Sequence, residues 1–388
     1  MQAVAKSASW KMIDGALLNV RKRLLDLIKH RFALHTVERE MVARRIERLF
    51  DSTVIGGKYL RSALALDSFY ALNPNCNNAE LNKMAECASL LEMIHSFFLI
   101  VDDVMDESDT RRGKMCWHKN ADVGLSAVND AMLLDVFIDE IIRELYAGHP
   151  QVDRLCACHQ NSNRITHLGQ LLDTISVREI DAFTWDRQEI LCREIGHFML
   201  NSRYLVAVSL FVSKFLVVHL AFFTCSYEQL VEMKTSHYTF FQPVEMAMLV
   251  SDRMDHRRVL RHLLYKIGFL FQSQDDHLDV FGNPQLTGKT GTDIQDGKCT
   301  WISVRAVQKL REKPELDEFK VNYGRGNPEN VDNIRKLLYR LDIQEDFMNF
   351  EKKYSDKLRD DINKVPLELS PLKPVLHAVV TKLLGREK

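Results

Sequence analysis

Glycine and proline are scarce in this chain: its 388 residues include only 16 Gly and 9 Pro. These two residue types form most tight turns, so their scarcity argues against a protein built from many short strands. No segment repeats, and no stretch alternates apolar and polar residues beyond a few positions. Lys+Arg (52) and Asp+Glu (53) nearly balance, whereas nucleic-acid-binding proteins usually carry a basic excess. We therefore expect no nucleic-acid partner.

Paired cysteines are also lacking. The eight cysteines are scattered, and only Cys156 and Cys158, followed by His159, lie close together. No second pair stands at the spacing of a zinc site, so we expect free thiols in a reducing compartment. The first ten residues lack the continuous apolar core of a secretory signal. Together these features predict a cytoplasmic protein.

One long apolar run stands out, from Leu205 to Thr224, with Lys214 as its single formal charge. The run is long enough to cross a bilayer. Lys214 would then lie near the bilayer midplane, where a charge is costly. Membrane contact is expected only if this segment is genuinely present and exposed.

Outside this run, apolar residues recur at helical spacing. The polar stretch 107–123 is expected to be a loop. We predict a single all-α domain over residues 1–388. Its helices are expected over residues 10–49 (one or two helices), 60–72, 79–106, 124–147, 152–176, 227–250, 255–280, 299–312, 330–363 and 371–384.

Two aspartate clusters follow apolar helical runs, and both read Asp-Asp-x-x-Asp. The first contains Asp102, Asp103 and Asp106, and the second contains Asp275, Asp276 and Asp279. On a helix, positions i and i+4 share a face, so the outer two aspartates of each cluster point together. Carboxylates at a helix C-terminus face the negative end of the macrodipole and repel one another. They therefore call for a cation.

Magnesium is the cation that this pattern favours, because it takes oxygen ligands and keeps part of its shell for water or phosphates. Two such clusters facing each other across a helical bundle would bridge Mg²⁺ to a diphosphate. Basic residues that can grip phosphate oxygens accompany them. They stand in Gly56-Gly57-Lys58 with Arg61, in Thr110-Arg111-Arg112-Gly113, in Lys234-Thr235 and in Thr287-Gly288-Lys289.

With these motifs in place, the sequence resembles the trans-isoprenyl diphosphate synthase family, of the animal farnesyl diphosphate synthase type. The resemblance runs from Gly56 to about Trp301 and keeps the family's order of motifs. It implies an all-α isoprenoid synthase bundle around a deep central cavity, usually a homodimer, with three Mg²⁺ ions. The matching segments are GGKYLR, HSFFLIVDDVMDESDTRRGKMCWHK, VGLSAVNDAMLL, GQLLD, KTSHYTF, FQSQDDHLDVFGNP and TGKTGTDIQDGKCTW.

The resemblance also implies roles for individual residues. Asp102, Asp103, Asp106 and Asp275 would hold magnesium, with Asp276 and Asp279 supporting. The allylic diphosphate would bind to Arg111, Lys234, Lys289 and Gln272, and Thr235 would steady the carbocation. Isopentenyl diphosphate would bind to Gly57, Lys58, Arg61, His95 and Arg112. The implied product is farnesyl diphosphate, made by head-to-tail condensation with dimethylallyl or geranyl diphosphate.

Two bulky side chains, Phe97 and Phe98, bear on the length of the product. Phe97 and Phe98 precede Asp102 by about one helical turn, so two rings there would form a floor under the growing chain. The family links such a floor to farnesyl or shorter products.

The chain departs from the family pattern at several positions. Leu60 and Ser62 flank Arg61 where Asn and Gly are common, His95 and His277 replace the usual Gln and Tyr, and Gln242 replaces a Leu. The C-terminal Gly385-Arg386-Glu387-Lys388 is a weakened basic tail. A terpene synthase on the same scaffold, ionising and cyclising geranyl or farnesyl diphosphate, is therefore the alternative.

The gap between Asp173 and Lys234 is about twice the family's, with the excess at about 190–225. This anomalous apolar insertion has three interpretations: a genuine helical insertion, a membrane anchor, or a translated intron.

Overall fold

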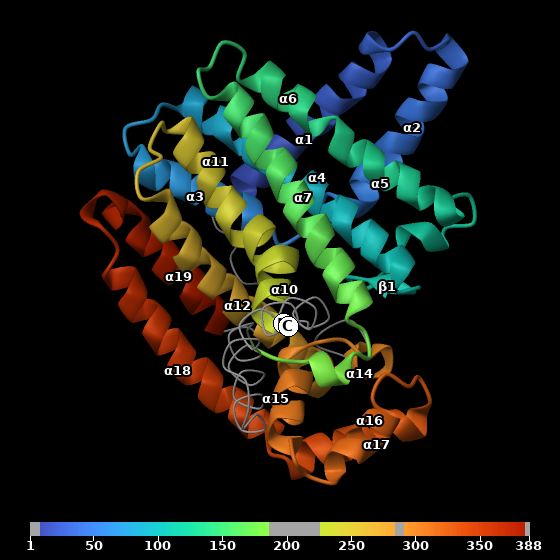
Figure 1. Ribbon diagram of the computed structural model, residues 1–388. Coiled ribbons are helices and arrows are strands. Elements are labelled where there is room, and N and C mark those ends of the chain that lie inside the picture. Colours follow the sequence, from blue (N-terminus) through green and yellow to red (C-terminus); the bar gives the residue numbers. More distant parts are fainter. Residues whose placement is uncertain (1–7, 186–225, 284–290, 385–388) are drawn as a thin grey trace, which may run out of the picture. The chain divides into compact units, whose positions relative to one another are not determined.

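The computed structural model describes residues 8–185, 226–283 and 291–384. Helices make up almost all of the regular structure in these ranges, as the sequence predicted, and the one described sheet is a two-stranded hairpin (Figure 1). The described chain divides into two compact units, and the all-α prediction holds in each. The first unit comprises Met1–Asn163, Tyr238–Leu263 and Asp361–Lys382, and the second comprises Arg164–His237, Leu264–Asp360 and Leu383–Lys388.

The first unit is built around one long buried helix, α4. It begins at a capping box, in which Asn77 and Glu80 exchange side-chain and backbone hydrogen bonds; this motif satisfies donors that a helix start otherwise leaves open. α1, α3 and α5 pack against α4, and α11 packs mainly on α3. The helices are α1 (Ala8–Arg31), α2 (Thr36–Thr53), α3 (Leu60–Leu72), α4 (Asn78–Met105), α5 (Ala127–Val136), α6 (Ile138–Leu145), α11 (Gln242–Val250) and α19 (Lys373–Leu384).

α4 is also the one described helix that is long and apolar enough to cross a membrane. Most of its apolar window is buried inside the protein, 72% by residue. Buried residues of α4 such as Met84, Leu91 and Ile94 join the core of the first unit. α4 is therefore a core helix. The apolar run 205–224, which prompted the membrane question, lies outside the described residues.

The second unit has its own core, in which Phe183, Tyr227, Trp301, Phe319 and Phe347 are buried. α16 packs on α15 and α17 (Figure 1). Three long helices contribute residues to both units: α7 (Val152–Ile175), α12 (Arg257–Phe281) and α18 (Ile343–Asn363). The remaining helices of this unit are α10 (Tyr227–Val231), α14 (Asp293–Asp296), α15 (Trp301–Leu310), α16 (Glu315–Asn322) and α17 (Pro328–Arg340).

Several boundaries differ from the sequence prediction. The segment 124–147 forms two helices that break at Phe137, and 330–363 divides at Asp342, whose φ of 53° cannot continue a right-handed helix. The expected loop 107–123 contains the hairpin β1 (Thr110–Arg111) with β2 (Lys114–Met115) and a 3₁₀ turn at Trp117–Lys119. Further 3₁₀ turns lie at Gly124–Ser126, Ile180–Ala182 and Leu367–Leu372.

The helix expected over 227–250 is not a regular α-helix. Between α10 and α11 the backbone forms a π-helix over Glu232–Phe241. π-helical turns are rare in proteins, and those that occur often lie at functional sites. This one carries Lys234 and Thr235, two of the predicted site residues.

In the second unit, the described chain on the two sides of residues 186–225 is joined by hydrogen bonds. Thr184 and Ser226 form an isolated parallel bridge, and the Tyr227 N–H donates to the Thr184 carbonyl at 2.9 Å. The Glu228 N–H and the Ser226 hydroxyl both donate to the Trp185 carbonyl at 3.1 Å. Contacts among described residues therefore hold the two flanking segments together. The insertion expected at about 190–225 itself lies outside the described residues.

This tie predicts that residues 186–225 are dispensable for folding. Closing a shorter loop between fixed ends changes the free energy of unfolding little, by roughly 1 kcal/mol. We expect a variant with a short Gly/Ser linker in place of 186–225 to keep its melting temperature and its product. Removal of the apolar run should also lower aggregation, which light scattering measures. A deletion variant that is soluble but unfolded by circular dichroism would contradict this expectation.

Candidate active site

The first aspartate cluster ends α4 in the first unit. Asp103 is buried, 4% exposed, whereas Asp102 and Asp106 are more accessible. Arg111, on the hairpin that follows, donates from Nε to Asp103 Oδ1 at 2.8 Å and lies 3.4 Å from Asp102 Oδ2. The cluster thus has two kinds of member: Asp103 anchors an arginine, and Asp102 and Asp106 are accessible for a ligand.

Arg111 is held firmly by this contact. Burial alone would lower its pKa, but the contacts with Asp103 and Asp102 outweigh burial and raise the pKa. The guanidinium is therefore a fixed positive charge at the end of α4. A fixed cation beside accessible carboxylates suits a ligand that is itself a metal-bound anion.

A second cationic cluster of the first unit surrounds the Gly56-Gly57 turn. Gly56 has a φ of 89°, which favours glycine. A Cβ at Gly57 would lie 3.2 Å from Arg112 Nη1, so this glycine lets the guanidinium approach the backbone. Lys58 follows directly, before Tyr59 and the start of α3.

Tyr59 and its neighbours hold this turn in place. Tyr59 itself has a φ of 52°, a left-handed conformation that is strained for a residue with a side chain. Its hydroxyl accepts from the Gly56 N–H at 2.7 Å and donates to Asp14 at 2.8 Å. Trp10 stacks on the Tyr59 ring at 5.1 Å between centroids and donates to the Gly57 carbonyl. The strained turn is therefore set by contacts from α1, which the sequence did not indicate.

Arg61 and His95 complete this cluster. Arg61 is buried; its Nη2 donates to the Tyr238 hydroxyl at 2.8 Å and to Thr239 at 2.9 Å, and its guanidinium carbon lies 4.4 Å from the Tyr238 ring centroid. The His95 ring lies 6.3 Å from the Tyr238 ring. Burial, with Arg61, Arg112 and Arg111 nearby, lowers the pKa of His95 well below its usual value, so its imidazole is neutral at pH 7.

Two buried nitrogen atoms in this cluster have no hydrogen-bond partner among the described residues: Arg61 Nε and His95 Nδ1. Buried polar atoms of native proteins are nearly always hydrogen-bonded, so an exception calls for an explanation. A bound anion, whose oxygen atoms would accept hydrogen bonds from these nitrogen atoms, would explain the exception. The cluster, with Lys58 and Arg112, is therefore built for such an anion.

The second aspartate cluster lies near the end of α12, in the second unit. Asp276 is buried at 4% exposure, and it accepts from the Tyr227 hydroxyl at 2.6 Å, from the Trp301 N–H at 2.8 Å and from Gln272 Nε2 at 2.9 Å. Burial raises the pKa of Asp276 to about 6 despite these contacts. These contacts fix α12 to the start of α15.

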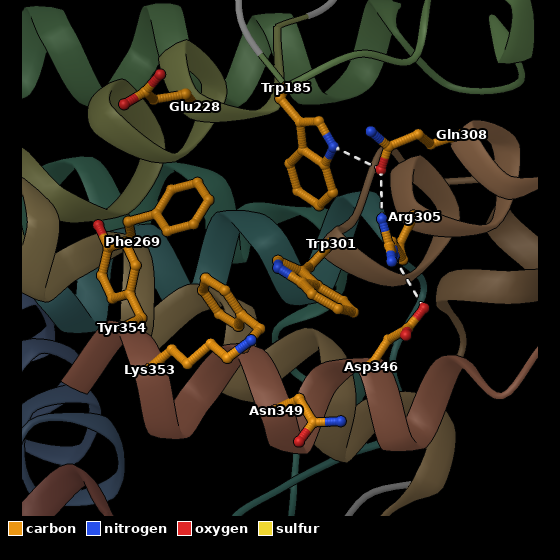
Figure 2. A pocket seen from close by; sticks show the side chains of 11 residues that line it. Trp185, Glu228, Phe269, Trp301, Arg305, Gln308, Asp346, Asn349, Lys353 and Tyr354 are labelled. Atoms are coloured by element: carbon orange, nitrogen blue, oxygen red, sulfur yellow. Dashed lines mark hydrogen bonds and ion pairs between the residues drawn. The ribbon is translucent and has the colours of Figure 1, made fainter. Parts of the chain in front are cut away.

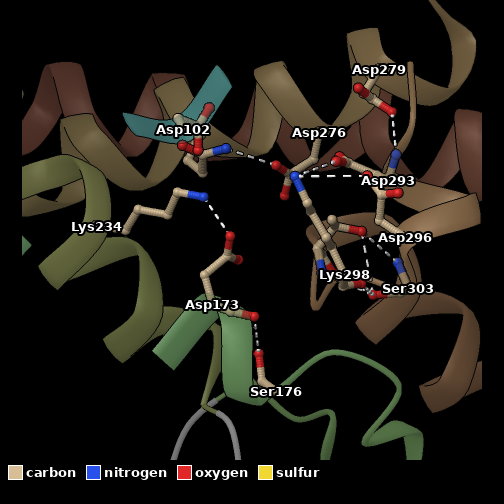
Figure 3. A network of polar contacts seen from close by, with 12 residues as sticks. Asp102, Asp173, Ser176, Lys234, Asp276, Asp279, Asp293, Asp296, Lys298 and Ser303 are labelled. Atoms are coloured by element: carbon tan, nitrogen blue, oxygen red, sulfur yellow. Dashed lines mark hydrogen bonds and ion pairs between the residues drawn. The ribbon is translucent and has the colours of Figure 1, made fainter. Parts of the chain in front are cut away.

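Asp279 orders the chain beyond α12. Its Oδ1 accepts from the Asp293 N–H at 3.0 Å (Figure 3). A Cβ at Gly291 would lie 1.9 Å from the Asp279 carbonyl oxygen, so only glycine fits there. Lys289, predicted to bind diphosphate, lies outside the described residues, as does the tail Gly385-Arg386-Glu387-Lys388.

Lys234 and Thr235 project from the π-helix in the second unit. Lys234 Nζ donates to Asp173 Oδ2 at 2.5 Å, and the Asp173 carbonyl accepts from Ser176 (Figure 3). The Thr235 hydroxyl donates to Gln272 Oε1 at 2.6 Å, and Gln272 in turn donates to Asp276. The structure therefore joins Thr235, Gln272 and Asp276 in one chain of hydrogen bonds, and Lys234 precedes Thr235 on the same π-helix.

Two glycines let neighbouring helices close on the π-helix. A Cβ at Gly169, on α7, would lie 2.3 Å from the Lys234 backbone nitrogen. A Cβ at Gly268, on α12, would lie 2.2 Å from Ser236 Oγ. The obstacle at Gly169 is backbone, which cannot move aside as a flexible side chain can.

Gly169→Ala is therefore expected to displace Lys234. Overpacking of this kind typically costs about 1–3 kcal/mol, so the melting temperature should fall and activity should fall at least about tenfold. Gly15→Ala is the matched control, because Gly15 lies in α1 and a Cβ added there would meet no atom within 4 Å. That change should raise stability by about 0.5–1 kcal/mol. Equal behaviour of the two variants would refute the proposed close approach.

The chain accommodates the other departures from the family pattern in its interior. Gln242, fully buried, accepts from Ser162 Oγ at 2.7 Å. His277 stacks on Phe347 at 4.2 Å between centroids with an 11° interplanar angle. Burial lowers the pKa of His277 to about 4, so it is neutral at pH 7 and serves as an aromatic ring, as the usual Tyr would.

A cavity of about 720 Å³ in the second unit is separate from these groups (Figure 2). Aromatic side chains dominate its wall, among them Trp185, Trp301 and Tyr354. Its charges balance, and Arg305 is already paired with Asp346 at 2.9 Å. Diphosphate binding needs an excess of cations, so this cavity is not a candidate for the active site.

Within the described residues, no three Asp, Glu, His or Cys side chains converge closely enough to hold a metal by themselves. The donor chemistry nevertheless fits magnesium, because Asp102 and Asp106 are accessible carboxylates at one helix end. Mg²⁺ commonly completes its shell with waters and substrate phosphates rather than with protein ligands alone.

Comparison with known proteins identifies the family of this chain. The polyprenyl synthetase family matches residues 43–210 and 218–341. Farnesyl pyrophosphate synthases are similar: that of Mus musculus is 30% identical over 89% of this chain and 88% of its own, and that of Zea mays is 32% identical over 88% of each. The structure of T. brucei farnesyl diphosphate synthase with a bisphosphonate has a TM-score of 0.80 at 27% identity, covering 98% of this chain and all of that one. The chain therefore belongs to the polyprenyl synthetase family and is a prenyltransferase with the all-α isoprenoid synthase fold.

Proposed function

We propose that this prenyltransferase condenses isopentenyl diphosphate head to tail with dimethylallyl and geranyl diphosphate, and that its product is farnesyl diphosphate. The observation that carries the proposal is the cluster of two cations, Arg61 and Arg112, beside neutral His95, in which two buried nitrogen atoms have no hydrogen-bond partner among the described residues. A terpene synthase needs no second diphosphate pocket, so this cluster favours condensation. The similarity to farnesyl pyrophosphate synthases supports the same choice.

Isopentenyl diphosphate is assigned to this cluster. Lys58 and Arg112 would bind the diphosphate oxygens, Arg61 Nε and His95 would complete the contacts, and Gly57 would leave room for the approach. Arginine binds phosphate oxygens in a bidentate manner and lysine acts as a point charge. Neutral His95 would donate a hydrogen bond without adding charge.

The allylic diphosphate is assigned to Arg111, Lys234, Gln272 and Lys289. These groups stabilise the negative charge that develops on the leaving diphosphate as the allylic C–O bond breaks. Thr235, held by Gln272, would place its side-chain oxygen toward the resulting carbocation. The isopentenyl double bond then attacks the cation, and the released diphosphate takes the final proton, so no dedicated side-chain base is needed.

Three Mg²⁺ ions would neutralise the allylic diphosphate and assist its departure. Asp102, Asp103, Asp106 and Asp275 are the residues that would hold these ions, with Asp276 and Asp279 in support. Asp103 would act mainly by fixing Arg111, and Asp276 by fixing α12, as their buried contacts favour.

We also propose that the protein is cytoplasmic and that it forms a homodimer. α5 and the turn before it carry exposed apolar side chains, with Leu125 at 79%, Met132 at 53% and Val136 at 56%. Their helical spacing makes one stripe, which a second copy would cover. Met132→Glu is expected to convert the dimer to a monomer in analytical ultracentrifugation. The control is Tyr339→Glu, a substitution of another exposed residue, which should leave the dimer intact. If Met132→Glu remains a dimer, the dimer interface does not include this stripe.

The two diphosphate assignments are tested by steady-state kinetics of two variants. Arg112→Gln should raise KM for isopentenyl diphosphate about tenfold or more while KM for geranyl diphosphate changes little. Lys234→Gln should raise KM for geranyl diphosphate, change KM for isopentenyl diphosphate little, and also lower kcat. If both variants raise the same KM, the division into two half-sites is wrong.

A further inference from the structure

Glu92 lies beneath the cationic cluster of the first unit, and no role has yet been assigned to it. It stands on α4 within the apolar run Leu90–Ile94 and is only 4% exposed. A buried carboxylate is costly unless it is paired and hydrogen-bonded. Ser62, fully buried on α3, donates from its hydroxyl to Glu92 Oε1 at 2.8 Å.

The backbone N–H of Ser62 also lies near this carboxylate and favours its charged form. α3 begins at Leu60, so Ser62 belongs to its first turn, where the N–H groups have no partner within the helix. The preceding Tyr59 provides no side-chain cap. The Glu92 carboxylate, from a neighbouring helix, therefore lies at the first turn of α3, where a negative charge matches the positive end of the helix dipole.

α3 carries the cationic groups of the cluster at this same end. Arg61 directly precedes Ser62, and Lys58 stands just before the helix begins. Arg61 and Arg112 repel each other, and each favours the charged form of Glu92. Burial nevertheless raises the pKa of Glu92. In its charged form, Glu92 would offset the repulsion between the two arginines.

We propose that Glu92, fixed by Ser62, is a positioning residue for the isopentenyl diphosphate half-site: it anchors the first turn of α3 and holds Arg61 and Arg112 in place before the substrate binds. The inference rests on the proposed assignment of that half-site. It explains Ser62, the residue beside Arg61 where the family pattern has glycine, as the donor that fixes the carboxylate.

Removing the negative charge has two opposing effects on binding. The pocket becomes more positive, which favours a diphosphate. The arginines also lose the group that holds them, and misplacement by about 1 Å can cost about a hundredfold. Geometry should outweigh net charge, because a guanidinium binds phosphate oxygens through directed, bidentate hydrogen bonds.

The test is steady-state kinetics of Glu92→Gln, which keeps the size of the side chain and removes its charge. We expect KM for isopentenyl diphosphate to rise about tenfold to a hundredfold, with KM for geranyl diphosphate and kcat within about twofold of wild type. Ser62→Ala should raise the same KM about threefold to tenfold, and Ser62→Thr, which keeps the hydroxyl, should restore part of the loss. A merely structural role would change both KM values and kcat together.

Arg112→Gln serves as the reference variant. If Arg112→Gln raises KM for isopentenyl diphosphate and Glu92→Gln leaves it unchanged or lowers it, the positioning role is refuted and the half-site stands. If Arg112→Gln also leaves that KM unchanged, the half-site itself is wrong. Should Glu92→Gln fail to fold, Ser62→Ala gives the deciding result, because alanine is well tolerated in a helix.

Discussion

Asp102→Ala is expected to lower kcat by about a thousandfold or more while the protein stays folded. Asp102 lies at the accessible end of α4 and outside the buried core, and its proposed role is to serve the departing diphosphate. Removal of one preorganised electrostatic group typically costs about 10²–10³ in rate, and loss of a metal ligand should cost at least as much. The melting temperature should be unchanged or slightly higher, because an acid at a helix C-terminus is unfavourable by about 0.3–1 kcal/mol.

The control for this variant is Asp109→Ala. Asp109 lies in the loop beyond the same cluster, is 85% exposed at its side chain and pairs with Lys119. Surface pairs of this kind contribute little, so activity and stability should both stay near wild type. An Asp102→Ala enzyme with kcat within about threefold of wild type would remove Asp102 from the active site.

Phe98→Ala is expected to change the main product from farnesyl diphosphate to a longer chain such as geranylgeranyl diphosphate. Phe98 stands one helical turn before Asp102 on α4. Its ring lies 4.9 Å from that of Phe97 and 5.5 Å from that of Tyr238. Truncating it would open space below the metal-binding end of the helix, where the growing chain is expected to lie.

The structure separates the two phenylalanines that the sequence treated alike. Phe97 is 6% exposed and belongs to the core of the first unit, whereas Phe98 is only partly buried and packs against that core. Phe97→Ala should therefore cost about 3–5 kcal/mol of stability, and Phe98→Ala less. Phe50→Leu, a core change on α2, controls for destabilisation alone. If Phe98→Ala makes the same product as wild type, the ring is ordinary core and not a floor for the chain.

Much of the fold was predictable because its helices are long and strongly periodic. α4 was expected over 79–106 and runs from Asn78 to Met105. The missed features are local conflicts with that periodicity. The break at Phe137 and the left-handed Asp342 interrupt patterns that continue through them. The π-helix at Glu232–Phe241 packs closely against Gly169 and Gly268, which are distant in sequence.

The site was predictable where chemistry is concentrated in short motifs, and not where it depends on tertiary contacts. The aspartate clusters and Arg111 are adjacent in sequence, and the structure joins Arg111 to Asp103. Asp173, Tyr238 and Glu92 act through partners 61, 177 and 30 positions away. Asp173 and Tyr238 lie in the matched segments GQLLD and KTSHYTF, and Glu92 stands out as an acid within an apolar helical run, but the partners of all three could not be read from the sequence. No sequence pattern indicated that Trp10 and Tyr59 hold the Gly56-Gly57 turn in place.

Product analysis of the purified protein with Mg²⁺ tests the central claim most directly. One reaction contains isopentenyl and dimethylallyl diphosphate, a second contains geranyl diphosphate alone, and a third contains farnesyl diphosphate alone. The account predicts farnesyl diphosphate in the first reaction and no conversion in the other two. Hydrocarbons or alcohols from geranyl or farnesyl diphosphate alone, with no condensation in the first reaction, would contradict it and make the protein a terpene synthase.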